Sequence, residues 1–203
     1  MSETELKKIS EMPADSLTGA NNPYVPGREL HYAAKLTLHR DYDTDLDPVT
    51  FEVIRHALWN INEEHGGTIQ RVSGSPVAMY ALDLNPTIMT EDAEFVYVGP
   101  YMQYMSGVAD TQVKWILEYR SDNPGIFDGD MFLANDPWVG APHQQDVMLV
   151  CPVFWEGELF AWITNCLHQY DIGGATPGSF CPCLLYTSPS PRDLSTSRMP
   201  SSA

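Results

Sequence analysis

The stretch Asn135-Asp-Pro-Trp-Val-Gly-Ala-Pro-His-Gln-Gln-Asp146 opens the part of the chain that decides its fold. Two apolar runs follow, 147–155 and 159–163, with the dipeptide Glu156-Gly157 between them. Two β-rich runs around a short glycine-containing turn indicate a β-hairpin, here over about 146–166. A hairpin folds its two ends back onto each other, so residues that are distant in sequence become neighbours at its open end.

Counting from the turn predicts which side chains meet at that open end. With a two-residue loop, Gln145 faces His168, and strict alternation places Asp146 on the opposite face of the sheet. Pro152 cannot donate a ladder hydrogen bond, so a bulge is expected near it, and either a bulge or a three-residue loop shifts the register by one residue. We expect the shifted register, with Asp146 face to face with His168 and with His143 at the same end.

Two imidazoles and a carboxylate at one hairpin end predict a divalent-metal site with positions left open for water or substrate. His143, Asp146 and His168 are the candidate ligands, for Zn²⁺, Mn²⁺ or Fe²⁺. Asp171 lies within reach of His168 and is expected to orient it as a hydrogen-bond acceptor, which makes His168 and Asp171 the candidate catalytic pair. The competing interpretation is that these side chains only complete the packing of a strand end, as histidines in such places often do.

Two main helices are predicted upstream of the hairpin. Asp47 is a good N-cap and Pro48 fits the first helical position, so the first helix runs over about 48–65 and ends at Gly66-Gly67. Its apolar residues recur at i, i+4 and i+7 and are predicted to face the core. They are Ile54, Leu58 and Ile61. The second helix, over about 102–120, places the following residues on its core side: Met105, Ala109, Val113, Ile116 and Leu117.

Strands and turns are predicted for most of the remaining chain. Strands are expected over 77–82, 94–98 and 130–134, with a turn at Asn85-Pro86 between the first two. A short helix is expected over 29–40. Together with the hairpin and the two main helices, these elements predict an α+β fold built on a mixed sheet.

The two ends of the sequence differ in composition from the part between them. Residues 1–46 are polar, contain several Pro, Gly and Asp residues, and are predicted to form a leader and an acidic linker. Residues 183–203 resemble the in-frame translation of a sequencing adapter, and their Ser- and Pro-rich composition predicts disorder. We therefore expect 47–182 to be the N-terminal part of a larger subunit, and the chain to be an incomplete N-terminal fragment of it.

Composition argues against several classes of partner. The formal net charge is −16, which disfavours binding to nucleic acid or to an anionic membrane surface. No apolar stretch is long enough to span a bilayer. The cysteines outside the adapter-like end, Cys151, Cys166 and Cys181, indicate no disulfide framework, so the cytoplasm is the expected compartment.

Five motifs occur in order along the chain: Asp47-Pro-Val-Thr-Phe-Glu-Val-Ile-Arg55, Asn135-Asp-Pro137, His143-Gln-Gln-Asp146, His168-Gln-Tyr-Asp-Ile-Gly-Gly174 and Pro177-Gly-Ser179. Together they resemble the hydantoinase B/oxoprolinase family over residues 47–182. That family includes B-type subunits of ATP-dependent N-methylhydantoinases, the second half of 5-oxoprolinase, and α-type subunits of acetone and acetophenone carboxylases.

The resemblance implies a subunit that works with a hydantoinase A-like partner, which binds ATP and activates a small carbonyl substrate by phosphoryl transfer. In the carboxylase members a metal is held by a His-x-x-Asp pair and a later His, and these positions correspond to His143, Asp146 and His168. Where the family often has His before a Gly, this chain has Tyr97-Val98-Gly99, so the reaction subtype stays open.

We therefore expect a metal-binding catalytic subunit of an ATP-dependent enzyme that opens a cyclic amide. Ketone carboxylation is the alternative within the family. A non-haem iron oxygenase is a rival that the close spacing of the ligands fits poorly, and a non-catalytic interaction subunit is a further alternative. The fragment is expected to be inactive by itself.

Overall fold

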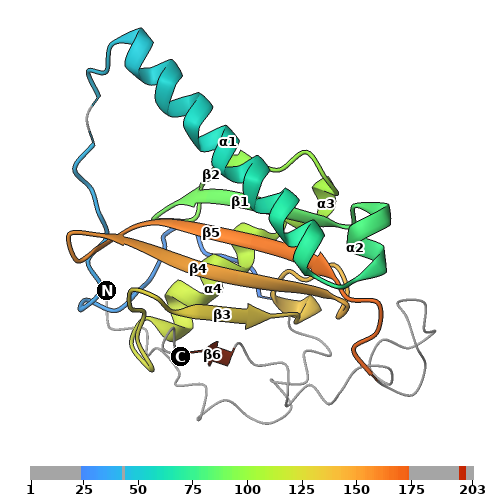
Figure 1. Ribbon diagram of the computed structural model, residues 1–203. Coiled ribbons are helices and arrows are strands. Elements are labelled where there is room, and N and C mark those ends of the chain that lie inside the picture. The colour runs from blue at the N-terminus through green and yellow to red at the C-terminus, as the bar shows by residue number, and fades with distance from the viewer. Residues whose placement is uncertain (1–23, 43, 174–196, 200–203) are drawn as a thin grey trace.

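The computed structural model describes residues 24–42, 44–173 and 197–199 (Figure 1). It has an α+β fold, as predicted, in which helices lie on both faces of one sheet. The strand order is β2-β1-β5-β4-β3-β6. The strands are β1 Leu84–Thr90, β2 Phe95–Val98, β3 Met131–Ala134, β4 Asp146–Trp155, β5 Glu158–His168 and β6 Ser197–Met199. The helices are α1 Pro48–Val72, α2 Pro76–Ala81, α3 Gln103–Ser106 and α4 Ala109–Arg120, with the 3₁₀ turn η2 at Pro137–Val139.

The sheet was predicted to be mixed, but every pairing between its named strands is antiparallel. A single parallel bridge joins Leu38 to Leu159, where the extended segment before α1 meets the hairpin. This segment replaces the helix that the sequence predicted over 29–40, and that prediction was wrong. The N–H of His39 donates to the carbonyl of Leu159 instead, over 2.9 Å.

The core lies between the sheet and α4. The residues that were predicted on the core side of the helix over 102–120 are fully buried, as expected. They pack against strand residues that include Met148, Val150 and Trp162. The helix predicted over 102–120 is broken at Gly107 and Val108 into α3 and α4. None of the described helices combines the length and the apolar character that a bilayer crossing requires.

Helix α1 begins as predicted and ends later than predicted. The Asp47 side chain accepts hydrogen bonds from the N–H groups of Val49 and Thr50, which caps the helix. The helix then continues through Gly66-Gly67 to Val72. Gly66 is buried, and a Cβ there would contact the Tyr101 ring and lie 3.1 Å from Cγ of Pro86. Gly66 therefore allows the helix to approach β1 closely and does not end it.

This contact predicts opposite effects for two neighbouring glycines. Gly66→Ala is expected to lower the free energy of unfolding by about 1–3 kcal/mol because the new methyl overpacks the helix–strand contact. Gly67→Ala is expected to raise it by about 0.5–1 kcal/mol, since its Cβ meets only Arg71 at 3.6 Å and alanine favours the helix. Urea unfolding of the two variants measures both, and equal effects of the same sign would contradict the packing described here.

Two further predictions upstream of the hairpin were wrong. The strand predicted over 77–82 is helix α2, because the Ser75 side chain caps the N–H of Ala78 and Pro76 occupies the first helical position. The turn predicted at Asn85-Pro86 lies inside β1. The Pro86 carbonyl accepts from the N–H of Gly99 on the side away from β5, so the missing N–H of the proline interrupts no bond to β5.

The prediction that 183–203 is disordered does not hold for Ser197–Met199. These residues form β6, which pairs with β3 at the edge of the sheet. The open edge of a strand offers unpaired N–H and C=O groups to any extended segment. The rest of 183–203 and residues 1–23 of the predicted leader lie outside the described residues, as do Cys181 and the Pro177-Gly-Ser179 motif.

Candidate metal centre

The β4–β5 hairpin has the shifted register that the sequence indicated. Trp155 pairs with Glu158 across a two-residue turn, but Val153 pairs with Ala161, so Phe160 is an extra residue on β5. The bulge lies one position from Pro152, near where it was predicted. From there to the open end the pairing is regular, and Asp146 pairs directly with His168.

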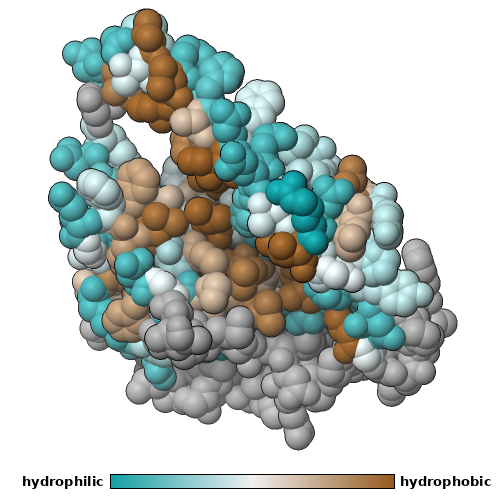
Figure 2. Space-filling model, viewed as in Figure 1, coloured by the Kyte–Doolittle hydropathy of each residue, from teal (hydrophilic) through white to brown (hydrophobic). Residues whose placement is uncertain are grey.

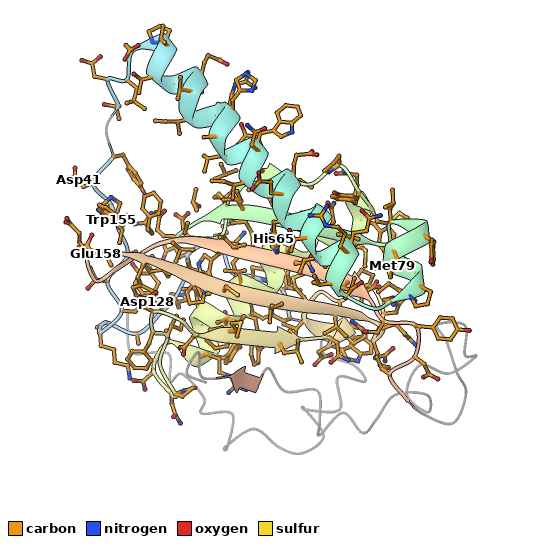
Figure 3. All side chains as sticks on the ribbon, in the orientation of Figure 1. Asp41, His65, Met79, Asp128, Trp155 and Glu158 are labelled. Carbon is orange, nitrogen blue, oxygen red and sulfur yellow. The ribbon has the colours of Figure 1, made fainter. Side chains whose placement is uncertain are left out.

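The open end of the hairpin lies at the opposite end of the sheet from its turn. Figure 3 shows Trp155 and Glu158 at the turn, and Met79 of α2 at the other end. A hydrogen bond fixes α2 against this open end, since the Ser75 hydroxyl donates to the His168 carbonyl over 3.0 Å. Asp146 lies on the same face of β4 as the core residues Met148 and Val150, so its side chain points inward.

Three of the predicted site residues come together there. His168 Nδ1 is 2.9 Å from Asp146 Oδ1, and His143 Nδ1 is 3.2 Å from Asp146 Oδ2. The two imidazole rings stand nearly perpendicular, at 81°, with their centroids 4.9 Å apart. Each of these three residues offers one ligand atom, and the three atoms lie within 4.8 Å of one another. In the described part of the chain, this is the group of His, Cys, Asp and Glu side chains that could hold a metal ion.

The donor atoms of this group fit a cation. Asp146 is fully buried, while His143 and His168 retain 23% and 12% of their side-chain exposure. His143 Nδ1 and Asp146 Oδ2 are sealed from solvent, and neither makes a hydrogen bond within the described residues, although they face each other. Buried polar atoms that make no hydrogen bond are costly, and a shared metal ion would satisfy both. The partly exposed histidines leave one side open for further ligands.

Burial dominates the electrostatics of the centre. It raises the pKa of Asp146 to about 7, against the opposing effect of His143 and with a further rise from the negative charge of Asp83. A carboxyl group with such a pKa releases its proton near neutral pH. Burial and the same two carboxylates raise the pKa of the Cys166 thiol, so Cys166 behaves as a buried apolar residue.

The structure adds Asp83 and Tyr104, which the sequence did not single out. Asp83 Oδ2 lies 3.7 Å from His168 Nδ1. The Tyr104 hydroxyl of α3 donates to Asp83 Oδ1 over 3.3 Å, and burial together with Asp146 and Asp83 raises the pKa of this phenol. Asp83 lies two residues after the end of α2, and the strand predicted over 77–82 gave no indication that the chain turns there towards the centre.

Asp171 is not brought into the cluster. Its side chain is exposed, and its carboxylate accepts the N–H of Gly173 in its own loop over 2.8 Å. The carboxylates that the structure places against His168 are Asp146 and Asp83.

Comparisons with known proteins agree on one family. The sequence model described as hydantoinase B/oxoprolinase matches residues 47–184. The chain is 30% identical to 5-oxoprolinase 1 of Arabidopsis thaliana over 136 residues, which is 67% of this chain and 11% of that protein. It is also 30% identical to the B-type chain of a putative D-/L-hydantoinase of Pseudomonas sp. (strain NS671) over 136 residues, 66% of this chain and 23% of that one.

Two solved structures resemble the fold. The nucleotide-free structure of acetone carboxylase matches 65% of this chain and 17% of its own, with a TM-score of 0.62 and 26% identity. The ATP-dependent caprolactamase from Pseudomonas jessenii matches 74% of this chain and 28% of its own, with a TM-score of 0.53 and 21% identity, and it supports the fold alone. The chain thus spans about a tenth to a quarter of the length of the curated relatives it matches.

Proposed function

Because the chain belongs to the hydantoinase B/oxoprolinase family, we propose that it is part of the metal-binding catalytic subunit of an ATP-dependent enzyme that opens a cyclic amide. The observation that carries the proposal is the cluster of His143, Asp146 and His168, in which two ligand atoms sealed from solvent face each other without a hydrogen bond. Several relatives are named as 5-oxoprolinases, as a hydantoinase chain and as a caprolactamase chain, which supports the cyclic amide as substrate class.

Each residue of the centre has a distinct task in this proposal. His143, Asp146 and His168 would hold a divalent ion, Zn²⁺, Mn²⁺ or Fe²⁺, whose chemistry is to polarise a carbonyl and stabilise a developing oxyanion. Asp83 faces His168 at 3.7 Å. It adds negative charge beside the ligands, and the Tyr104 hydroxyl holds its other oxygen in place. The sheet excludes water from Asp146, while the exposed side of His143 leaves room for substrate.

The proposed partner is a hydantoinase A-like subunit that binds ATP. Relatives are named as B-type, alpha and beta subunits, which implies assemblies of more than one kind of chain. In this arrangement the partner activates the substrate with ATP, and the centre described here acts on the activated carbonyl compound.

Ketone carboxylation is the second candidate, and one observation favours it. The acetone carboxylase structure matches this chain with a TM-score of 0.62 and 26% identity. In either reaction a cation held by these residues would polarise a small carbonyl compound, so the residues of the centre suit both.

A chimera tests the proposed function. Residues 47–173 of this chain replace the matching segment of the caprolactamase β-subunit, which is then assembled with its partner subunit. We expect ATP-dependent ring opening that His143→Ala lowers by at least about 10³-fold in kcat/KM. Asp171→Asn, an exposed residue beyond β5, is the matched control and is expected to stay within about threefold. Activity that survives His143→Ala would favour a non-catalytic interaction subunit. The same substitution in a chimera with the acetone carboxylase α-subunit tests the carboxylase alternative.

The pKa of Asp146 predicts a titration near neutrality in the metal-free protein. Because burial raises this pKa to about 7, Asp146 is protonated below that pH and gains its charge above it. A cation needs the carboxylate, so metal affinity should rise as pH increases through 7 and level off above it. Carbon-13 NMR of the carboxyl groups, with Asp146→Asn to assign the signal, should give a midpoint near 7 that disappears when Zn²⁺ is added. A midpoint at the ordinary aspartate value of about 4 would contradict this description of the site.

A further inference from the structure

The N-terminal half of α1 extends past the sheet (Figure 1). The buried residues of this helix, Asn62 and Gly66, lie in its second half, and its strand contacts are with β1 and β2. Residues 48–61 include no buried side chain. An isolated helix of this length is marginal in water, and most helical stability comes from packing of an apolar face.

This projecting half is apolar over much of its circumference. Its exposed large apolar residues are Val49, Phe51, Val53, Ile54, Trp59 and Ile61. At 100° per residue, all of these residues except Trp59 fall in one arc of about 200°, from Val49 round to Phe51. This is about twice the stripe that a surface helix usually buries. The predicted core stripe of Ile54, Leu58 and Ile61 lies within this arc, so the residues that the sequence assigns to a core have no core here.

The apolar surface continues onto the sheet. Figure 2 shows apolar side chains along the side of α1 that faces the sheet, and further ones on the sheet face beneath it. On this face, opposite the core, the strands contribute half-buried or exposed apolar residues. They are Leu133, Val147, Leu149, Cys151, Val153 and Ile163. A continuous apolar surface of this kind marks a docking site.

We propose that the projecting half of α1 and this sheet face together bind the polypeptide that hydantoinase B-type subunits carry outside the matched segment. In the whole subunit, α1 is then a core helix. In the relatives, the matched part is 11–24% of the chain, so most of their polypeptide is available to cover this surface. The inference rests on family membership and is independent of the metal centre and of the reaction.

The shape and charge of the surface favour this occupant over a second copy of the chain. A helix packed against α1 from one side covers a single stripe, whereas an arc of about 200° needs cover on at least two sides. Two copies would also bring together two chains of formal net charge −16 each. A polypeptide that fills the space between α1 and the sheet covers both surfaces at once.

Hydrogen exchange tests the proposal in two proteins. In the chain of 203 residues by itself, amides of 48–61 are expected to exchange fast, and sedimentation is expected to show a monomer. In the caprolactamase chimera described above, without its partner subunit, the same amides should exchange at least about 100-fold more slowly. Ile54→Asp should abolish that protection, whereas Tyr80→Asp, at a position that is 83% exposed and outside the docking surface, should leave it unchanged.

Each other outcome overturns the proposal. A dimer of the isolated chain with protected 48–61 would assign the surface to a second copy, and protection that appears only on adding the partner subunit would assign it to that subunit. Equal exchange in the chain and the chimera would mean that nothing covers α1. If the chimera does not accumulate as a folded protein, the natural caprolactamase β-subunit is measured instead, and fast exchange of its segment aligned with 48–61 would reject the proposal. None of these readouts depends on metal or turnover, so they separate this inference from the proposed function.

Discussion

Asp146→Asn is expected to lower the affinity of the protein for Zn²⁺ by at least about 10³-fold. The substitution removes the negative charge that lies between the two imidazoles, at 2.9 Å from His168 and 3.2 Å from His143. An amide keeps the size of the carboxylate but not its charge, and Asp146 is fully buried, so water cannot take its place. Competition with a chromophoric chelator measures the affinity, and circular dichroism confirms that the variant is folded.

Two other carboxylates give graded controls for this experiment. Asp83→Asn is expected to lower the affinity by about 10–100-fold, because Asp83 faces His168 at 3.7 Å and acts beside the three ligands. Asp171→Asn is expected to leave it unchanged, since Asp171 is exposed and bonds within its own loop. A larger loss from Asp171→Asn than from Asp83→Asn would restore the role that the sequence predicted for Asp171 and contradict the geometry of the centre.

Trp162→Ala is expected to lower the free energy of unfolding by about 3–5 kcal/mol. Trp162 is fully buried in the core and pairs with Pro152 beside the bulge that sets the register. Its indole Nε1 donates to the Glu91 carbonyl over 3.1 Å, so truncation also leaves a buried acceptor without its donor. Urea unfolding monitored by circular dichroism measures the loss.

Trp155 on the same hairpin is the matched control. It lies at the turn and is 60% exposed, so Trp155→Ala is expected to change the free energy of unfolding by less than about 1 kcal/mol. Similar losses for the two tryptophans would mean that the bulged part of the hairpin is not packed as described.

The hairpin and its register could be predicted from the sequence because both depend on local chemistry. Glu156-Gly157 adopts positive φ values of 50° and 87°, as a two-residue hairpin turn requires. Pro152 indicated the nearby bulge, and one extra residue was then enough to bring Asp146 opposite His168. Counting the residue pairs of the hairpin was enough to predict that His143, Asp146 and His168 converge. Asp171 lies beyond the last of these pairs, so the counting did not place it.

Features that depend on contacts between distant segments could not be predicted in this way. Gly66 was assigned to a helix end because its close approach to Pro86 and Tyr101 is invisible in sequence. Asp83 reaches His168 only because α2 turns the chain towards the hairpin end. The stripe of Ile54, Leu58 and Ile61 was predicted to face a core, but Ile54 and Ile61 are exposed, and no described residue buries them.

The proposed chemistry depends on His143, Asp146 and His168 binding one divalent cation together. An anomalous difference map from crystals grown with Zn²⁺ shows directly whether they do. We expect one strong peak about 2.0–2.2 Å from an imidazole nitrogen of each histidine and from a carboxylate oxygen of Asp146. A fully occupied zinc elsewhere on the molecule, with no peak among these three side chains, would show that the cluster is not a metal centre.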